Sequence, residues 1–542
     1  MSLKAPWRAS FWRRSTCGLK NASWAVAIAV AVLVVAIVPA VVLRSGTLSV
    51  ATTIQWKDIV TKTGDRLPDF SFCGYRASEQ PLPSNTTRPA ISLNAQAGSS
   101  EDDDTTRIQK VLDSTAKSGG GVVALGDGDF ILKSSGLRIP SGVVLRGAGV
   151  GRTRLTLRDL GQDALISFGS KNATPSVLPF AAANIIDQIV PIGSVEVTVA
   201  DAKGFKPGQH VFVKRLVTAE WVDANGMGDL VLDGERQTWI KVGTVVRQPR
   251  VIRSIQGNTI TLNIPLTDSL NAKYMQPFIV AYDPPDTSSE MGIEYLSIVL
   301  SPTCSGARVD SSSESEGACD APAISFDPWS ADSWARNLEL IGFNTFVTLQ
   351  ANTSRITIQN VAMIRDADAA AAGNADSRAL PGDIILQGAT QVLIADCSQR
   401  GLPSARSFAV MTQSLTPGPN AILRHVTSSN DEQMVFPHQR WAHGLLVEDT
   451  ATAVHLVNRA TNGSGHGWAV NAGVGWNLRG YSIVQSPPLG INWCVGCSGT
   501  VDDRSNGTFV DSGGQGRGPG QRTMVQPNSL FDAQLRARLN TP

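Results

Sequence analysis

Histidine is concentrated in one part of this 542-residue chain. Five of its six histidines lie between His425 and His466, whereas the last lysine is Lys273. Residues 274–542 therefore offer only arginine and histidine as basic groups. An imidazole changes its charge near neutral pH, so it can take up or release a proton during a reaction. The C-terminal half is therefore where we expect acid–base chemistry.

Three of these basic residues are spaced so that they could meet. Alternation along a strand would place His438 and Arg440 on one face, and His466 follows 28 residues after His438, about one coil of the repeat described below. Asp431 and Glu432 lie just upstream; because they are adjacent, they would point to opposite faces and only one would reach the same groove. These five are the candidate catalytic residues.

The grouping suits β-elimination from a uronate sugar. Arg440 could form a bidentate pair with the sugar carboxylate and neutralise its charge. A histidine could then remove the C5 proton or protonate the leaving oxygen. Hydrolysis would instead need two carboxyl groups about 5–10 Å apart. Asp431 or Glu432, with the more remote Glu448 or Asp449, are the candidates for such a pair.

Tryptophan recurs at a regular distance in the same region. Trp441, Trp468 and Trp493 are spaced by 27 and 25 residues. A repeat of about 20–50 residues built from short strands is typical of stacked coils, each of which buries its inner face against its neighbours. Residues expected to bind substrate lie at or beside these positions: His443, Asn471, Asn492 and Trp493. For His425 and His455 we expect a hydrogen bond from the ring to the backbone.

The elements around these residues predict an all-β solenoid. Short β-type runs, such as 122–125 and 143–145, are separated by glycine-rich turns. An amphipathic helix is expected at about 104–117. The expected organisation is a basic tail (1–23), a membrane helix (24–43), a stalk (44–66), an N-terminal cap with the first coils (67–184), an inserted small β domain (185–285), coils with the candidate site (286–525) and a capping helix at the open end (526–542).

Residues 103–149 carry a more specific pattern. Asp104 to Gln109 reads DTTRIQ, Gly119 to Val123 reads GGGVV, and Val144 to Gly149 reads VLRGAG. This resembles the N-terminal signature of the pectate lyase superfamily, in the rhamnogalacturonase/epimerase-like type of domain, and the likeness extends over roughly 67–540. The resemblance implies a right-handed parallel β-helix and a polysaccharide as the partner. It does not specify the reaction, because lyases, hydrolases, epimerases and non-enzymes share this fold.

The N-terminal region predicts a single membrane crossing. Residues 24–43 form an uncharged, mostly aliphatic run of about the length that spans a bilayer, and five basic residues precede it. Positive charge stays on the cytoplasmic side, so the bulk of the chain is expected to be extracellular or lumenal. The alternative is a cleaved signal peptide with a site near Ser49 to Ala51 and a secreted product.

Composition limits the partners and cofactors further. The formal net charge of +1 predicts no nucleic-acid partner, and a monomer is expected. Cys494 and Cys497 are expected to form a local disulfide or to remain two thiols, not a zinc site. No metal is assigned; calcium at Asp102 to Asp104 is possible, although helix capping explains these residues as well. Five Asn-x-Ser/Thr triplets fit an exported glycoprotein: Asn85, Asn172, Asn352, Asn462 and Asn506.

Two classes of function are consistent with these observations. The first is a carbohydrate-active enzyme, foremost a polysaccharide lyase acting on an acidic glycan and otherwise a hydrolase of the polygalacturonase type. The second is a non-catalytic surface protein that binds glycans or serves as a stalk. Where relatives of the superfamily carry a His-Asp-Phe stretch, this chain has Arg406, Ser407 and Phe408. That departure puts a catalytic His–Asp pair in doubt and keeps the second class open.

Overall fold

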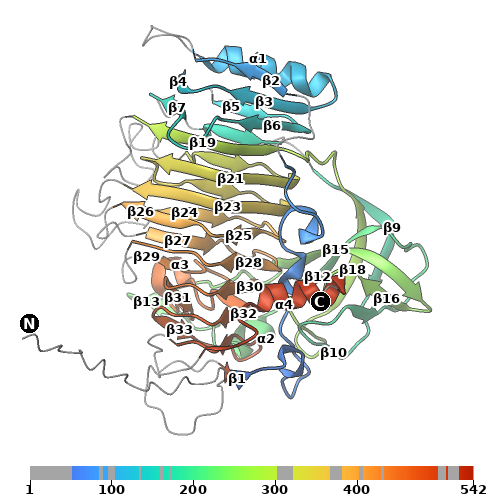
Figure 1. Cartoon of the computed structure of the whole chain (residues 1–542). Coiled ribbons are helices and arrows are strands. Elements are labelled where there is room, and N and C mark those ends of the chain that lie inside the picture. The colour runs from blue at the N-terminus through green and yellow to red at the C-terminus, as the bar shows by residue number, and fades with distance from the viewer. Residues whose placement is uncertain are drawn as a thin grey trace, which may run out of the picture. The chain divides into compact units, whose positions relative to one another are not determined.

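Short strands stack in parallel into two long sheets in the computed structural model (Figure 1). The structure describes residues 52–84, 90–95, 104–133, 136–158, 163–169, 174–301, 321–365, 381–401, 407–428, 433–498, 508–510 and 524–540. Successive coils contribute strands to both sheets, and every pairing within the two sheets is parallel. The chain is therefore a parallel β-helix, as the resemblance implied, and its expected all-β solenoid is confirmed.

The first sheet has 15 strands. They are β2 (Ala90–Leu93), β3 (Gly121–Leu125), β4 (Gly128–Leu132), β6 (Val143–Arg146), β7 (Thr153–Leu157), β19 (Gly292–Leu300), β21 (Ala331–Ile341), β23 (Ser354–Arg365), β25 (Leu393–Ala395), β26 (Ser398–Gly401), β28 (Asn420–Leu423), β30 (Ala442–Glu448), β32 (Val470–Trp476), β34 (Trp493–Val495) and β35 (Thr508–Val510).

The second sheet has nine strands. They are β5 (Leu137–Ile139), β8 (Ile166–Phe168), β20 (Ile324–Phe326), β22 (Val347–Leu349), β24 (Gly382–Leu386), β27 (Ser407–Thr412), β29 (Gln433–Val435), β31 (Ala453–Leu456) and β33 (Ser482–Val484). Alternate side chains point into the core between the sheets. Phe168 and Phe326, for example, stack with ring centroids 4.5 Å apart inside it.

The helix α1 (Asp104–Lys117) covers the first coils. Its apolar side chains Ile108 and Leu112 are fully buried in the β-helix core. The Asp104 carboxylate accepts a hydrogen bond from the backbone N–H of Ile131 (3.0 Å), which ties the helix to β4. The helix expected at about 104–117 is confirmed with the same bounds.

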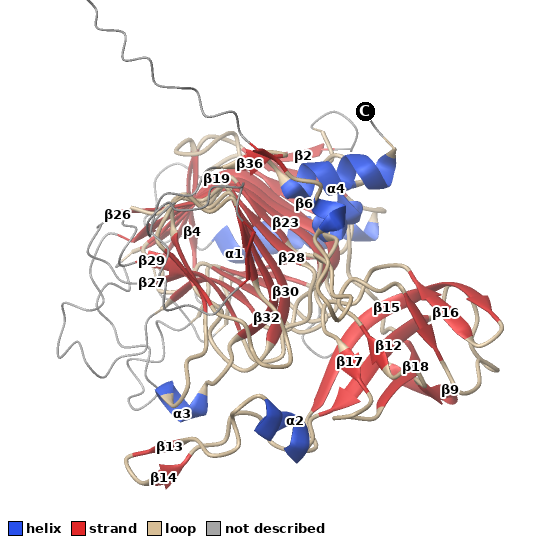
Figure 2. Ribbon diagram, turned by 90° about the horizontal axis from the view of Figure 1, so that it is seen from below, coloured by secondary structure: helices blue, strands red, loops and turns tan. Residues whose placement is uncertain are grey.

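A six-stranded antiparallel sheet is inserted between the early and late coils (Figure 2). Its strands are β9 (Ser176–Asn184), β11 (Glu196–Thr198), β12 (His210–Leu216), β15 (Val245–Gln256), β16 (Thr259–Leu262) and β18 (Pro277–Asp283). The same segment carries α2 (Ala219–Ala224) and two short pairs, β10 (Ile189–Val190) with β17 (Leu270–Asn271) and β13 (Val231–Leu232) with β14 (Glu235–Arg236). The inserted sheet begins at Ser176, earlier than the stretch expected at 185–285, and its last strand ends at Asp283.

The segment expected as a stalk packs against the fold over its described part. Strand β1 (Thr52–Thr53) pairs in parallel with β36 (Val525–Gln526). The chain then passes through the short 3-10 helices η1 (Trp56–Asp58), η2 (Phe70–Phe72) and η3 (Tyr75–Ser78). Residues 52–66, expected as part of a stalk, are instead bonded to the fold: the N–H of Ile54 donates to the backbone oxygen of Gln526 (2.7 Å), and the N–H of Arg66 donates to that of Ile192 (3.0 Å).

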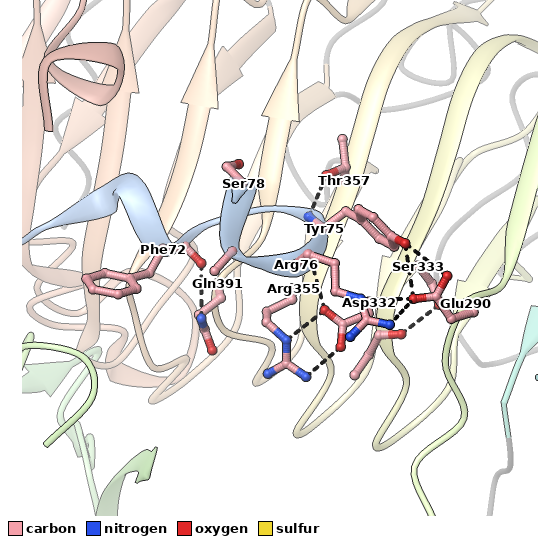
Figure 3. Close-up of polar contacts among 12 residues, drawn as sticks. Phe72, Tyr75, Arg76, Ser78, Glu290, Asp332, Ser333, Arg355, Thr357 and Gln391 are labelled. Atoms are coloured by element: carbon pink, nitrogen blue, oxygen red, sulfur yellow. Dashed lines mark hydrogen bonds and ion pairs between the residues drawn. The ribbon is translucent and has the colours of Figure 1, made fainter. Parts of the chain in front are cut away.

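Polar contacts fasten this N-terminal segment across the first sheet (Figure 3). The Tyr75 hydroxyl donates to the Glu290 carboxylate (2.9 Å), and the backbone N–H of Arg76 donates to Asp332 (3.1 Å). Arg355 forms a bidentate pair with Asp332 at 2.8 and 2.9 Å. Residues far apart in the sequence are thus connected over several coils.

The C-terminal helix α4 (Leu530–Leu539) lies against the side of the coil stack, beside β30 and β32 (Figure 1). Leu530 and Phe531 are buried with outward-facing side chains of the first sheet, including Leu446 and Val474. The expectation that this helix caps the open end is wrong, because its apolar side chains are buried against the apolar outer face of the first sheet.

Glu448 at this helix predicts an unusual pH dependence of stability. Burial raises the pKa of its carboxyl to about 7 from the ordinary 4.5, so the folded state favours the protonated form. The contribution of this carboxyl to the free energy of unfolding is present below pH ~4.5 and is lost as pH rises through ~7. The total loss is about 3 kcal/mol. We expect Glu448→Gln to match the wild type at low pH and to be more stable above neutrality. Urea unfolding across pH measures this; parallel curves for the two proteins would contradict it.

The predictions about cysteines, metals and the membrane can be compared with only part of the chain. Cys494 and Cys497 form a local disulfide, while Cys73 and Cys397 are buried free thiols. Within the described ranges no group of three or more His, Cys, Asp or Glu could hold a metal ion. No helix in the part of the chain that the structure describes is long and apolar enough to cross a membrane, and residues 24–43 lie outside that part.

Candidate functional site

The outer face of the second sheet changes character along the coils. A single register row runs from Arg138 through Ser167, Ser325 and Thr348 to Ile385 and Met411. These side chains alternate with core residues and therefore point outward. The row is polar over the N-terminal coils and becomes apolar towards the C-terminal ones. Any ligand lying along this face would meet polar groups at one end and apolar groups at the other.

Aromatic rings and histidines gather at the C-terminal end of this face. We call them the histidine–aromatic patch: Phe408, Phe436, His438, His455, His466 and Tyr481. Their ring centroids lie 4.7 to 6.0 Å apart in successive contacts. His438, His455 and Tyr481 are half-buried, so the patch is partly open to solvent. A row of rings of this kind presents flat apolar faces beside polar ring nitrogens.

His438 and His466 lie side by side, as their 28-residue spacing predicted. Their ring centroids are 4.7 Å apart and the rings are nearly perpendicular, at 88°. The registers agree, because β30 pairs with β32 at the same offset, His443 with Asn471. The Nδ1 atoms of both histidines have no hydrogen-bond partner among the described residues. Two imidazoles with unsatisfied nitrogens therefore share one site.

The reason given for this pairing was partly wrong. Strand β29 ends at Val435 and β30 begins at Ala442, so the intervening residues form a turn and not a strand. Arg440 and Trp441 have left-handed backbone conformations, with φ of 53° and 58°. Strand alternation therefore does not determine whether the side chains of His438 and Arg440 point to the same side.

Cationic neighbours and burial keep both imidazoles neutral. Burial, then Arg459 and Arg440, lower the pKa of His438 to about 4. Burial, then Arg459, His438 and Arg440, lower the pKa of His466 to about 4 as well. At neutral pH each ring is therefore uncharged and can accept a proton, although it is a weak base until an anion arrives.

Arg459 is the cation at this site that has a hydrogen-bond donor without a partner among the described residues. One of its Nη1 hydrogens goes to the backbone oxygen of His438 (2.6 Å), and its guanidinium lies 4.8 Å from the centroid of Phe436. Its buried Nε has no partner among the residues that the structure describes. A buried donor left unpaired is costly, so the guanidinium carries an unmet hydrogen bond at this site.

Arg440, expected to neutralise a substrate carboxylate, is engaged within the fold. Its Nε donates to the backbone oxygen of Trp239 (2.5 Å), Nη2 donates to the backbone and side-chain oxygens of Ser464 (3.0 and 2.7 Å), and Nη1 donates to Gln439. It connects the inserted domain to the short helix α3 (Asn462–Gly465). Arg459 is therefore better placed for the role assigned to Arg440.

The residues expected to bind substrate lie in the interior. His443 is 1% exposed and shares a 2.7 Å hydrogen bond with Thr267, and Asn471, Asn492 and Trp493 are each 0% exposed. Asn492 is used to bind the backbone N–H of Gly473 (2.7 Å). The expectation that these four side chains contact substrate is corrected: they satisfy polar groups or fill space inside the coils.

The tryptophans explain this error. Trp493 lies on the next coil but pairs in register with Val474, so it does not occupy the position equivalent to Trp468. Trp441 and Trp468 instead pack with Trp221 and Trp239 of the inserted domain. Their spacing reflects the contact between the inserted domain and the coils, not a repeat extending to Trp493.

The carboxylates proposed for hydrolysis are placed as follows. Asp431 and Glu432 lie outside the described residues. Glu448 is buried under α4 on the first sheet, and Asp449 pairs with Arg479 at 3.0 Å. Besides burial, the groups that lower the pKa of the two imidazoles are Arg459 and Arg440 and, for His466, also His438.

Sequence reasoning missed several members of the patch. His455 was assigned a backbone hydrogen bond, yet its Nε2 has no partner in the described part of the chain and its ring packs between Phe436 and Tyr481. The alternation of Val454, His455 and Leu456 would have shown that His455 points outward. His425 is fully buried, and its ring nitrogens likewise lack the expected backbone partner within the described ranges.

A column of polar residues leads away from the patch along the same edge of the second sheet. The backbone N–H groups of Gln350, Gln387, Gln413 and His438 each donate to the preceding coil at 2.8 to 3.0 Å, so they occupy equivalent positions. Gln350 lines a cavity of about 1050 Å³ beside α1, together with Arg138 and others. Gln387 and Gln413 line a cavity of about 490 Å³ beside the inserted domain. We call Gln350, Gln387, Gln413 and His438 the polar column. Its glutamines line the two cavities, and it ends at the histidines.

Solved structures that match this chain do so at low identity and low TM-score. A tailspike protein of Pseudomonas phage LKA1 is 13% identical, with a TM-score of 0.37, over 75% of this chain and 67% of that chain. A tailspike protein of E. coli bacteriophage HK620 is 10% identical, with a TM-score of 0.38, over 76% and 61%. The A-module of the mannuronan C-5 epimerase AlgE4 of Azotobacter vinelandii is 11% identical, with a TM-score of 0.22, over 76% and 96%.

The fold assignment rests on the strand pairing itself and not on these matches. No protein-family model matches the chain, and no curated protein sequence matches it.

Proposed function

We propose that this chain is a membrane-anchored, extracytoplasmic carbohydrate-active protein that cleaves a uronate-containing glycan by β-elimination. The observation that carries the proposal is the pair of neutral imidazoles, His438 and His466, beside Arg459 on an outer face lined with aromatic rings. Aromatic faces suit the apolar faces of sugar rings, and a guanidinium with unpaired donors suits a carboxylate.

The proposed reaction uses Arg459 to bind the carboxylate and His438 to move the proton. The guanidinium of Arg459 binds the uronate carboxylate and withdraws charge from C5. His438, the more exposed of the two histidines, takes the C5 proton. The electrons of the C5–H bond form the C4–C5 double bond as the C4–O bond breaks. The imidazolium then returns the proton to the leaving oxygen, so no other reactant is consumed.

His466 has a positioning part in this scheme. It is 9% exposed, and its Nε2 lies where a side chain at Gly463 would stand, 2.3 Å from that Cβ position. The ring is therefore held against the backbone of α3, nearly perpendicular to the ring of His438. It limits the rotation of the His438 ring that meets the substrate.

A rise in ultraviolet absorbance tests the reaction class. We expect the full-length protein, mixed with a panel of uronate polymers that includes polygalacturonate and alginate, to form an unsaturated uronide from at least one of them. New reducing ends without that absorbance would identify a hydrolase instead. Binding of the polymers without either signal would identify a glycan-binding protein and refute catalysis.

A further inference from the structure

We propose that the cavity between the inserted domain and the polar column is an anion subsite, which holds the carboxylate of a second uronate next to the sugar at the histidine–aromatic patch. This inference rests on the proposed function and names the part of the glycan that the inserted domain would bind. The cavity has a volume of about 490 Å³ and is lined by Lys214 and Arg247 on one side and by Gln387, Gln413 and Ser414 on the other.

Two like charges face each other here without a carboxylate. Lys214 of β12 is directly opposite Arg247 of β15 in the antiparallel register. Neither makes an ion pair among the residues that the structure describes. Like charges at directly opposite positions destabilise a sheet. Their presence in a cavity wall indicates an anion that belongs between them.

The local environment holds both cations towards the cavity. The Lys214 Nζ and the Arg247 guanidinium each lie 5.3 Å from the ring centroid of Phe212, which itself stacks on Tyr282 at 4.0 Å. Burial, then Arg247, lower the pKa of Lys214, and burial lowers the pKa of Arg247. Both side chains therefore carry a charge that is incompletely solvated. An anion bound in the cavity would compensate for the lost hydration.

The position relative to the histidines suits a neighbouring sugar. Gln413 is the residue of the polar column one coil before His438, because the N–H of His438 donates to the oxygen of Thr412 (3.0 Å). Adjacent strands are about 4.8 Å apart. Gln413 also accepts a hydrogen bond from Gln439 (3.1 Å), which contacts Arg440. The subsite thus begins about one strand spacing from the imidazole pair.

Equilibrium binding of defined oligosaccharides tests the subsite. The probes are tetrasaccharides of polygalacturonate, polymannuronate and polyguluronate, with cellotetraose as an uncharged match, and the full-length protein is used. Lys214→Met with Arg247→Met should weaken uronate binding about 10-fold or more, as expected for lost charge-assisted hydrogen bonds. Lys206→Met with Lys241→Met removes two exposed cations of the same domain and should leave binding unchanged.

The melting temperature separates a lost ligand site from a lost fold. Without ligand, the Lys214/Arg247 double variant should melt at or above the wild-type temperature, because repulsion has been removed. If it binds the uronate tetrasaccharides as tightly as wild type, or if none of the three binds the wild type, the subsite is refuted. The two proposals can fail separately. If the wild type binds the uronate tetrasaccharides and the double variant binds them more weakly, but no unsaturated product forms, β-elimination is refuted and the subsite is supported.

Discussion

Replacing His438 with alanine is expected to lower the turnover of the cleaved uronate polymer by about 10²–10⁴-fold, the usual contribution of a general base. The fold should be retained, because the ring lies on the outer face and is half-buried. The rate of appearance of unsaturated uronide measures the effect. Turnover within a few fold of wild type would remove His438 from the mechanism.

The pH dependence gives this prediction a second readout. Since the pKa of His438 is lowered to about 4, kcat/KM should rise with pH through about 4 and then remain level past the ordinary imidazole value of 6.5. Arg459→Met removes a cation that lowers the pKa of His438, so the acidic limb of the surviving activity should move to higher pH. A limb at an unchanged pH would show that Arg459 does not act on the base.

A matched control is available in the inserted domain. His210 lies on β12, outside the histidine–aromatic patch. His210→Ala should keep both the wild-type rate and the wild-type pH profile. A similar loss in both histidine variants would point to a general effect on folding instead of proton transfer.

Replacing Asp268 with alanine is expected to give the largest loss of stability, about 3–5 kcal/mol. Its carboxylate pairs with Arg215 at 2.7 Å, and both side chains are 1% exposed. It also accepts hydrogen bonds from Trp441 (2.9 Å) and Asn471 (3.1 Å) of the coils. The variant would leave a buried guanidinium unneutralised and would remove two hydrogen bonds between the inserted domain and the coils.

Urea unfolding with two further variants tests this account. Asp449→Ala breaks the partly exposed pair with Arg479 and should cost about 0–1 kcal/mol. Asp268→Ala combined with Arg215→Met should be more stable than Asp268→Ala alone, because the unpaired charge is gone. Equal midpoints for Asp268→Ala and Asp449→Ala would show that the buried pair does not join the two parts.

Local patterns were enough for much of the fold. The helix at 104–117 was found from its apolar stripe, and the inserted domain from strands that interrupt the rhythm of the coils. The adjacency of His438 and His466 followed from a 28-residue offset that the strand register confirms. Alternation failed at Arg440, because a turn with left-handed residues has no two-residue period.

The sequence by itself determined what short-range periodicity can encode: the solenoid, its helix at the first coils and the coil offset that pairs two histidines. Only the tertiary structure decided which polar groups are free. Arg440 is occupied by the inserted domain, His443 and Asn471 lie among buried groups around Thr267 and Asp268, and Arg459 keeps an unpaired donor. These outcomes depend on contacts between residues about 200 positions apart. Such contacts leave no period in the sequence, because they are set by how a separate domain packs against the coils.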